Sequence, residues 1–415
     1  MLQSRAFTKT RKEAPKDEVA KNAILLSRAG FIHKEMAGVY SLLPFGLKVI
    51  KKLESIIREE MNAIGGEEMK TSIFQNKEVW EKTNRWDDAV VESWFKTKLK
   101  NGTEIGLSFT NEEAYANIMR QYVNSYKDLP AYPYDFKDIF RNEVRSKSGI
   151  LRGREFYWKA LYSFSKNEQE HMEFYEKAKE AYRNIFNRAG IGETTYLTFA
   201  SGGTFSKYSH EFQTLTESGE DIVYLSRDKN LAVNKEVYTD EVLGDLDLDK
   251  DDLIEEKAIE VGNIFTLGTR FSEPLGLVYT DEDGTKKPVF MGSYGIGLGR
   301  LMGTVAEVLS DENGLVWPKE ISPFDIHLVL VGKNDSTREL ADEIYKTLEA
   351  EGIETLYDDR DVRAGEKFAD ADLMGISTRV IVGDKTSGGM LEVKDRATGE
   401  TREVTLEHLI TEFKK

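Results

Sequence analysis

Apolar side chains recur at the spacing of an amphipathic helix in two long segments of the chain. From Phe45 to Met61 they fall three or four residues apart, and a glycine pair at 65–66 supplies a stop. A second such segment ends at Gly190, and Ser165-x-x-Glu168 at its start is typical of a capping box, which begins a helix. We therefore predict two long helices.

Short runs typical of strands lie outside these helices, and several are separated by short turns or loops. Such connections favour an antiparallel sheet over a sheet built only from strand–helix–strand crossovers. The predicted strands cover residues 105–110, 136–144, 155–164, 260–267 and 288–294. Together the strands and helices indicate an α+β body.

The pattern changes at Ser322-Pro323. A strand-like run at 326–331 is followed by a Ser336-x-x-Glu339 capping box, a helix that ends at Gly352, and further strand-like runs at 353–357 and 379–382. Alternating strands and helices over about 90 residues predict a small α/β domain with a largely parallel sheet. We expect the body to occupy residues 1–322 and this domain residues 323–415.

Residues 239–256 contain nine acids against the single base Lys250. The acids do not have the spacing of a calcium-binding loop. We therefore interpret the segment as a solvated surface connection.

Composition excludes several kinds of chemistry. The 415 residues include no cysteine, which excludes disulfides, cysteine nucleophiles and thiolate metal sites. The five histidines form no H-E-x-x-H pattern, so we expect no metal site of the protein's own. No leader-like or membrane-spanning apolar run occurs, so a cytoplasmic protein is expected. A net charge of −16 opposes nonspecific adhesion to nucleic acid but permits a local basic groove.

Two arginine-rich segments could carry chemistry: F-R-N-E-V-R at 140–145 and L-R-G-R-E-F-Y-W-K at 151–159. If both are strands, Arg141 and Glu143 share one face, and Arg152, Phe156 and Trp158 share another. Arginine clamps phosphates and stacks on adenine, while a carboxylate can accept from an amino group or help to hold Mg²⁺. The combination suits a nucleotide, and a solvated, ion-paired hairpin is the alternative.

Three further segments have both a structural and a functional interpretation. G-S-Y-G-I-G-L-G-R-L-M-G at 292–303 fits neither a Rossmann nor a Walker pattern, so its glycines serve either close packing or a ligand. In S-F-T-N-E-E at 108–113, Thr110 could cap a helix, or Glu112 could meet a substrate ammonium group. In S-K-Y-S-H-E-F at 206–212, His210 is more often structural than catalytic.

In this order and separation, the segments resemble class II aminoacyl-tRNA synthetases. F-R-N-E with R-E-F is similar to motif 2, and G-S-Y-G-I-G-L-G-R is similar to motif 3. T-N-E-E, S-H-E-F and D-D-R-D-V-R-A-G-E-K-F-A-D-A-D-L-M-G-I at 358–376 resemble prolyl-tRNA synthetases, and the resemblance extends over nearly the whole chain. It implies an antiparallel six-stranded catalytic core with helices, a C-terminal anticodon-binding domain and a homodimer.

The resemblance also implies substrates and roles. ATP with substrate-bound Mg²⁺, L-proline and tRNA(Pro) are the expected substrates. Arg141 would neutralise the α-phosphate, Glu143 and Arg152 would position the nucleotide, and Arg300 would hold the triphosphate and stack near adenine. The residues expected at proline are Thr110 and Glu112 for its imino group, Arg141, and Phe156, Trp158 and His210 around its ring. Arg363 and Lys367 in the C-terminal domain are expected to contact tRNA.

Some positions depart from the family pattern, namely Ser72, Asn111, Ala160 and Ser293. Most bacterial members carry a large editing insertion between motifs 2 and 3, where this chain has only the acidic stretch after Tyr238. We therefore expect no removal of mischarged alanyl-tRNA in cis. A sister synthetase for threonine, serine or glycine and a noncatalytic tRNA-binding paralogue remain alternatives, although the joint presence of Arg141, Glu143 and Arg300 disfavours the paralogue.

Overall fold

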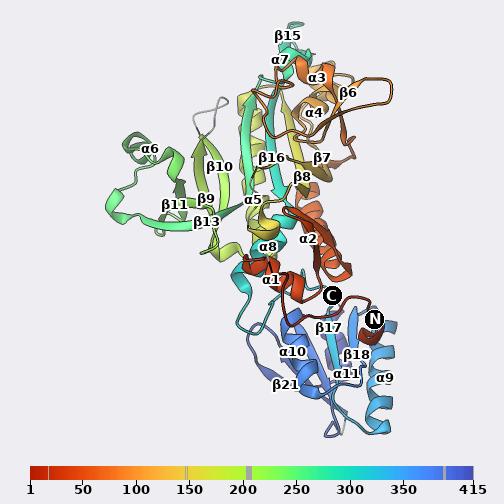
Figure 1. Cartoon of the computed structure of the whole chain (residues 1–415). Helices are drawn as coiled ribbons and strands as arrows, with labels where there is room; N and C mark the ends of the chain where they lie inside the picture. The colour runs from red at the N-terminus through yellow and green to blue at the C-terminus, as the bar shows by residue number, and fades with distance from the viewer. Residues whose placement is uncertain (17, 145, 147, 202–207, 387–388, 415) are drawn as a thin grey trace. The chain divides into compact units, whose positions relative to one another are not determined.

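The computed structural model describes residues 1–414 except 17, 145, 147, 202–207 and 387–388. The chain forms two compact units (Figure 1). The first consists of Met1–Glu35, Tyr40–Leu53 and Val305–Lys415, and the second of Met36–Val39 and Glu54–Thr304. Among the described residues, no helix is long and apolar enough to cross a membrane. The domain boundary at residue 322 stays a prediction.

The second unit is built on a nine-stranded sheet. Its strands lie in the order β10 (Tyr208–Leu215), β9 (Thr195–Ser201), β12 (Leu231–Asn234), β11 (Asp221–Ser226), β13 (Ile254–Gly268), β16 (Phe290–Gly297), β8 (Glu155–Ser165), β7 (Pro133–Phe140) and β3 (Glu67–Glu68). β10 also pairs with β13, so the strands β9 to β13 close on themselves. The central pairs are antiparallel, as predicted, and the sheet has nine strands where the family resemblance implied six.

The two faces of this sheet carry different side chains, because residues alternate along a strand. On one face, α4 (Glu112–Met119) and α7 (Ser272–Leu275) pack in a core with Ala160 and Tyr162 of β8. The helix α5 (Glu168–Arg188) covers the other face, where Tyr175 donates to the carbonyl oxygen of Ile264 at 3.2 Å. Figure 1 shows α5 running along the strands. The two faces of the sheet therefore offer different surroundings to a site.

Both predicted long helices exist, but one begins at a different residue. The first is α2 (Pro44–Ala63), as the apolar spacing predicts. The second, α5, is capped by Asn167, whose side chain accepts from the backbone N–H of Glu170. Ser165 is instead the last residue of β8 and pairs with Phe290 of β16. The predicted capping box at Ser165 is wrong because the sheet already uses that residue.

The predicted strand over 136–144 is too long. β7 ends at Phe140, and Arg141 adds only a single bridge to Trp94. A short 3-10 turn, η3 (Gly149–Leu151), precedes β8, which starts at Glu155. Arg141 and Glu143 therefore do not share a strand face, and Arg152 lies outside the strand that holds Phe156 and Trp158. Arg145 and Lys147 lie outside the described residues.

The acidic segment at 239–256 contains regular secondary structure and is not only a loop. It forms α6 (Asp240–Asp245), a 3-10 turn η6 (Lys250–Asp252) and the start of β13. Val242 and Leu243 are buried against Val233. Its acids point outward: eight of the nine are exposed and Glu256 is half-buried, which agrees with the predicted solvated surface.

A small three-stranded sheet stands beside the large one. Its order is β4 (Phe74–Asn76), β6 (Glu104–Leu107) and β5 (Lys96–Lys98), with α3 (Lys77–Glu81) between β4 and β5 in the chain. Trp80 and Trp94 are buried there, with Trp86 and Phe109 against them. Gly106 is needed because a Cβ at this position would lie 2.2 Å from the Trp94 ring. Strand β6 of this sheet ends at Leu107, shortly before Phe109 and Thr110.

The first unit contains the C-terminal sheet. Its order is β18 (Thr355–Asp358), β17 (Ile326–Leu330), β19 (Thr378–Val382), β20 (Met390–Asp395) and β21 (Thr401–Thr405). The first three strands are parallel, as predicted, and the last two are antiparallel, which the sequence analysis missed. The predicted capping box at Ser336 is wrong, since α9 (Asp335–Ala350) begins after Asn334 and contains that serine.

Besides short 3-10 turns, the described residues form further α-helices of 8 to 12 residues and two pairs of strands. The helices are α1 (Lys21–Arg28), α8 (Leu298–Leu309), α10 (Ala364–Met374) and α11 (Leu406–Phe413). The remaining strands form two pairs, β1 (Ile32–Met36) with β2 (Val39–Leu42) and β14 (Val278–Thr280) with β15 (Lys286–Pro288).

Candidate active site

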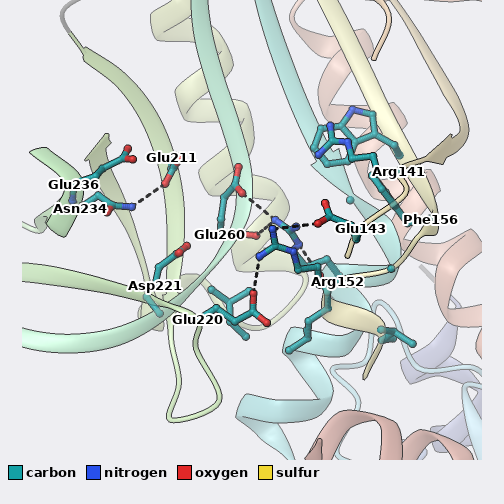
Figure 2. Close-up of a pocket in the computed structure, with 18 residues that line it drawn as sticks. Arg141, Glu143, Arg152, Phe156, Glu211, Glu220, Asp221, Asn234, Glu236 and Glu260 are labelled. Carbon is teal, nitrogen blue, oxygen red and sulfur yellow. Dashed lines mark hydrogen bonds and ion pairs between the residues drawn. The ribbon is translucent and has the colours of Figure 1, made fainter. Parts of the chain in front are cut away.

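A cavity of about 330 Å³ opens on the second unit, and charged side chains line it (Figure 2). Three arginines contribute, and all were singled out from the sequence: Arg141, Arg152 and Arg300. Six carboxylates lie around them: Glu143, Glu211, Glu220, Asp221, Glu236 and Glu260. The rings of Phe156 and Trp158 supply the apolar part of the wall. We name this cavity the open pocket.

Arg141 lies at the inner side of the open pocket, directly after β7. Its guanidinium carbon is 5.1 Å from the centre of the Phe109 ring and 5.4 Å from that of Phe156. Burial and the charge of Arg300 lower its pKa, although a guanidinium remains protonated. Its buried Nε has no hydrogen-bond partner within the described part of the chain. A donor held between two rings in this way is available to an anion.

Arg300 enters the open pocket from the first turn of α8, which follows β16 without a loop. Its Nε donates to the carbonyl oxygen of Leu151 at 2.9 Å. Its Nη1 donates to the carbonyl oxygen and the carboxylate of Glu260 at 2.9 and 3.0 Å. The preceding Gly295 lets the strand approach Trp158, because a Cβ there would lie 2.1 Å from the indole. Close packing is thus one use of the glycine-rich segment.

Arg152 is the most exposed of the three arginines, with 48% of its side chain accessible. Its guanidinium lies 3.0 Å from Glu220 and 3.5 Å from Glu143. Dashed lines in Figure 2 mark both contacts. The other oxygen of Glu220 accepts from the hydroxyl of Ser148 at 2.7 Å. Ser148 has a φ of +69°, a left-handed conformation that costs a non-glycine residue about 1–2 kcal/mol. Glu220, which directly precedes β11, thus contacts both Ser148 and Arg152 in the segment before β8.

The acidic side of the open pocket comes from β10, β11 and β13. Burial, and then the charge of Glu260, raise the pKa of Glu211 to about 8. Burial also raises the pKa of Asp221. The amide nitrogen of Gln213 donates to both of these carboxylates, at 2.9 Å each. Sequence reasoning missed this wall, although Glu211 lies in the S-H-E-F segment and Glu260 begins a predicted strand.

Thr110 and Glu112 lie together at the start of α4 and do not line the open pocket. The hydroxyl of Thr110 donates to the Glu112 carboxylate at 2.6 and 2.8 Å, so Thr110 does not cap the helix as one interpretation expected. The Tyr162 hydroxyl donates to Glu112 at 3.2 Å, and an arginine, Arg85, donates at 3.2 Å. The charge of Glu112 acts on Arg141, which connects this cluster to the pocket. We name Thr110, Glu112, Glu113, Tyr162 and Arg85 the closed end.

His210 does not belong to either group. It pairs with Ile264 on β13, and its Nδ1 lies 2.7 Å from the hydroxyl of Tyr175 on α5, on the face away from the pocket. Burial lowers its pKa to about 4. The neighbouring Glu211 faces the pocket instead, because strand residues alternate. A place for His210 at the proline ring is therefore wrong, and its structural interpretation fits. Positions 206 and 207 of this segment lie outside the described residues.

The two residues expected to contact tRNA differ in exposure. Arg363 is exposed at the residue before α10. Lys367 is only 3% exposed, and its ammonium donates to the carbonyl oxygens of Leu330 at 2.6 Å and Asp358 at 3.0 Å. The surface role expected for Lys367 is therefore corrected to a structural one, since its charge already serves the C-terminal sheet.

Two family descriptions match this chain. Residues 95–309 match the tRNA synthetase class II core domain (G, H, P, S and T), and residues 325–415 match an anticodon binding domain. A proline–tRNA ligase of Bacillus cereus (strain B4264) is 33% identical, with 99% of each chain covered. One from Bacillus anthracis (strain CDC 684 / NRRL 3495) is 32% identical over the same shares. Both alignments span 561 positions against the 415 residues of this chain, so these relatives contain about 150 residues that it lacks.

Solved structures with the same fold include two prolyl-tRNA synthetases. Prolyl-tRNA synthetase from Cryptosporidium parvum, complexed with L-proline and AMP, has a TM-score of 0.75 at 16% identity and covers 94% of this chain and 72% of its own. The Giardia lamblia protein, in complex with prolyl-adenylate, has a TM-score of 0.76 at 18% identity and covers 93% of this chain and 74% of its own. At these identities the likeness establishes the fold, and the antiparallel core with a C-terminal domain is as predicted.

Proposed function

The chain belongs to the proline–tRNA ligases, a family of class II aminoacyl-tRNA synthetases, and from this premise we propose a division of its site. The open pocket binds ATP, and the closed end binds the amino group of proline. The observation that carries this proposal is Arg141, a buried guanidinium with an unused N–H between the pocket and Glu112. The reaction joins proline to AMP there and then transfers the prolyl group to tRNA.

In the open pocket, the arginines would meet the phosphates of ATP. Arg141 neutralises the α-phosphate, while Arg152 and Arg300 hold the triphosphate, with the Arg300 plane near adenine. Glu143 accepts from the base or keeps Arg152 in place. Because Arg152 is half-exposed and paired with Glu220, it can exchange that carboxylate for a phosphate. ATP binding would then release the contact that Glu220 makes across the pocket.

Magnesium would enter with the nucleotide as part of the substrate. Six carboxylates against three arginines give the pocket a negative balance, which repels a polyphosphate that carries no cation. Glu260, and Glu211 once it has lost its proton, would supply oxygen ligands of the type that Mg²⁺ prefers. Burial and then the charge of Glu260 raise the pKa of Glu211, and a bound cation would oppose that rise. When bound, Mg²⁺ neutralises phosphate charge during the displacement.

At the closed end, the ammonium group of proline would be received by Glu112 and Thr110, and its ring would lie against Phe156 and Trp158. A proline carboxylate oxygen then attacks the α-phosphorus, and pyrophosphate leaves with the electron pair of the broken P–O bond. No side chain forms a covalent intermediate. The chain's contribution is alignment and neutralisation of charge, which are the main terms in phosphoryl transfer.

The second half of the reaction would use the C-terminal residues 325–415 to hold tRNA(Pro), with Arg363 among the contacts. We also propose that the protein works in the cytoplasm as a homodimer, which sedimentation at micromolar concentration tests. Since about 150 residues of its relatives have no counterpart, we propose that the chain does not clear mischarged alanyl-tRNA in cis. Rapid deacylation of alanyl-tRNA(Pro) by the pure protein would contradict this.

The test of the proposed function is ATP–pyrophosphate exchange with each of the twenty amino acids. We expect exchange with proline well above all others. Exchange that depends on threonine, serine or glycine would move the chain to a sister specificity. No exchange with any amino acid would favour a noncatalytic tRNA-binding role.

A further inference from the structure

Two adjacent glutamates at the closed end are bridged by one arginine that the sequence analysis did not single out. The Nη1 of Arg85 donates to Glu112 at 3.2 Å and to the two oxygens of Glu113 at 3.0 and 3.2 Å. The Glu113 side chain is fully buried, and those of Arg85 and Glu112 are 16% and 11% exposed. Burial raises the pKa of Glu113 to about 7, and the positive charge of Arg85 opposes that rise.

The surroundings of Arg85 hold it in one position. Its guanidinium carbon is 4.9 Å from the centre of the Trp80 ring and 5.2 Å from that of Phe271. The hydroxyl of Thr83 donates to Glu113 at 2.8 Å, which fixes the carboxylate that anchors the arginine. Arg85 does not line the open pocket. We therefore expect Arg85 to act on proline through Glu112, to which it donates.

The bonds at Glu112 leave room for few donors. A carboxylate accepts about four hydrogen bonds, and Thr110, Tyr162 and Arg85 already supply three. The Thr110 hydroxyl, which donates to Glu112, still has lone pairs to accept with. One site on Glu112 and one on Thr110 match the two N–H groups of a secondary ammonium. A primary ammonium would bring a third.

We propose that Arg85 is a positioning residue for the amino acid: anchored by Glu113, it holds the Glu112 carboxylate in place and aimed at the secondary ammonium group of proline. The proposal rests on the proposed function, which assigns Glu112 to that group. Loss of Arg85 should therefore weaken the binding of proline strongly and the binding of ATP little.

The chain contains a matched control for this arrangement. Arg188, the last residue of α5, also bridges two adjacent glutamates, with 2.7 Å to Glu59 and 3.1 Å to Glu60. Its side chain is 28% exposed and that of Glu59 is 61% exposed, so solvent screens the pair. Arg188→Gln removes the same chemistry from a surface site.

The experiment compares wild type, Arg85→Gln, Arg85→Lys, Glu113→Gln and Arg188→Gln in ATP–pyrophosphate exchange, with KM measured separately for proline and for ATP. We expect Arg85→Gln to raise the KM for proline about tenfold or more and to change the KM for ATP less than twofold. Arg85→Lys should recover part of the lost affinity for proline, because a lysine ammonium keeps the positive charge but lacks the fixed N–H geometry of a guanidinium. Glu113→Gln removes the carboxylate that anchors Arg85 and should raise the KM for proline, by a smaller factor than Arg85→Gln because Arg85 keeps its contact with Glu112. Arg188→Gln should match wild type.

The pH dependence of the KM for proline is a second readout, which would not change if Arg85 only stabilised the fold. Burial raises the pKa of Glu113 to about 7 even beside Arg85. Without the arginine, the two adjacent carboxylates hold a shared proton to higher pH, so the fall in the KM for proline as pH rises from 6 to 8 should be steeper in Arg85→Gln than in wild type. The double variant Arg85→Gln/Glu113→Gln removes the competing charge and should lose that slope. This variant also tests the proposal if Arg85→Gln folds poorly, which circular dichroism reports.

The outcomes separate this proposal from the function on which it rests. If wild type shows no proline-dependent exchange, the proposed function fails. If wild type activates proline but Arg85→Gln keeps its KM for proline, or changes the KM for proline and for ATP equally with no steeper pH slope, the role of Arg85 fails alone. A tenfold rise confined to proline, with the steeper pH slope, supports it.

Discussion

The open pocket and the closed end use the same residue types in opposite ways. In the open pocket, Arg152 is 48% exposed and its partner Glu220 is 40% exposed, so water and ligands can reach the pair. At the closed end, Arg85 and Glu113 are 16% and 0% exposed, and the rings of Trp80 and Phe271 flank the arginine. An exposed ion pair is worth little and exchanges readily, whereas breaking a buried one is costly.

This difference suits two substrates of different chemistry. A flexible polyphosphate can replace carboxylates one at a time, so pairs such as Arg152 with Glu220 can be exchanged for phosphates. A small ring with one ammonium group offers few contacts, so its receptor has to be assembled before it arrives. Arg141 lies where the two meet, because it lines the pocket and feels the charge of Glu112.

The largest effect is expected from Arg141→Ala, which removes the residue between the open pocket and the closed end. In Arg141→Ala, the buried donor between Phe109 and Phe156 is lost, and the α-phosphate keeps its charge during the attack. We expect kcat/KM for ATP–pyrophosphate exchange to fall about 10³-fold, the scale found when one preorganised donor to a reacting oxyanion is removed. Arg183→Ala is a suitable control, since Arg183 on α5 is 48% exposed and pairs with Glu180. Exchange within tenfold of wild type in Arg141→Ala would contradict its role.

A second prediction concerns the acidic wall of the open pocket. The folded pKa of Glu211 is about 8, above the unfolded value of 4.5, so between these pH values the folded chain binds a proton that the unfolded chain does not. Stability from this group is therefore present below pH 4.5 and is lost as pH rises through 8. Glu211→Gln should raise the melting temperature relative to wild type at pH 9 by about 2 °C or more, and less at pH 5.

The control for this prediction is Glu180→Gln on α5, where the side chain is 64% exposed. Its melting temperature should follow that of wild type at both pH values. A Glu211→Gln variant that is destabilised equally at pH 5 and pH 9 would show that the carboxylate is charged and favourably paired in the folded chain.

The smallest effect is expected outside both ends of the site. Arg363→Ala removes one exposed charge before α10 and should reduce the rate of tRNA charging by about threefold to tenfold, the worth of about 1 kcal/mol, with exchange unchanged. Charging at the wild-type rate over a range of tRNA concentrations would remove Arg363 from the contact surface.

The residues of the open pocket could be found from sequence where type and spacing carry the information. Arg141, Glu143 and Arg152 lie in short segments whose composition suits a nucleotide, whereas the role of Arg300 comes from the resemblance of its glycine-rich segment to motif 3. Their faces could not be assigned, since β7 ends at Phe140 and the chain then turns. Likewise, alternation shows that either His210 or Glu211 faces the pocket, but only the pairing of His210 with Ile264 decides which.

The closed end and the acidic wall depend on contacts that no local pattern contains. Arg85 lies 27 residues before Glu112 in the chain, in a loop without a motif, and meets it through packing on Trp80 and Phe271. Glu211, Asp221 and Glu260 come from three strands that close on themselves. The helix starts at Ser165 and Ser336 were misplaced for a related reason, since a capping pattern does not exclude a strand end or a helix interior.

The most direct test of the account compares Arg300→Ala with Glu112→Gln in the same ATP–pyrophosphate exchange assay, with KM determined for each substrate. The division of the site predicts a crossed result: Arg300→Ala raises the KM for ATP at least tenfold and that for proline less than threefold, and Glu112→Gln does the reverse. If both variants shift the same constant, or each shifts both equally, the open pocket and the closed end do not bind different substrates.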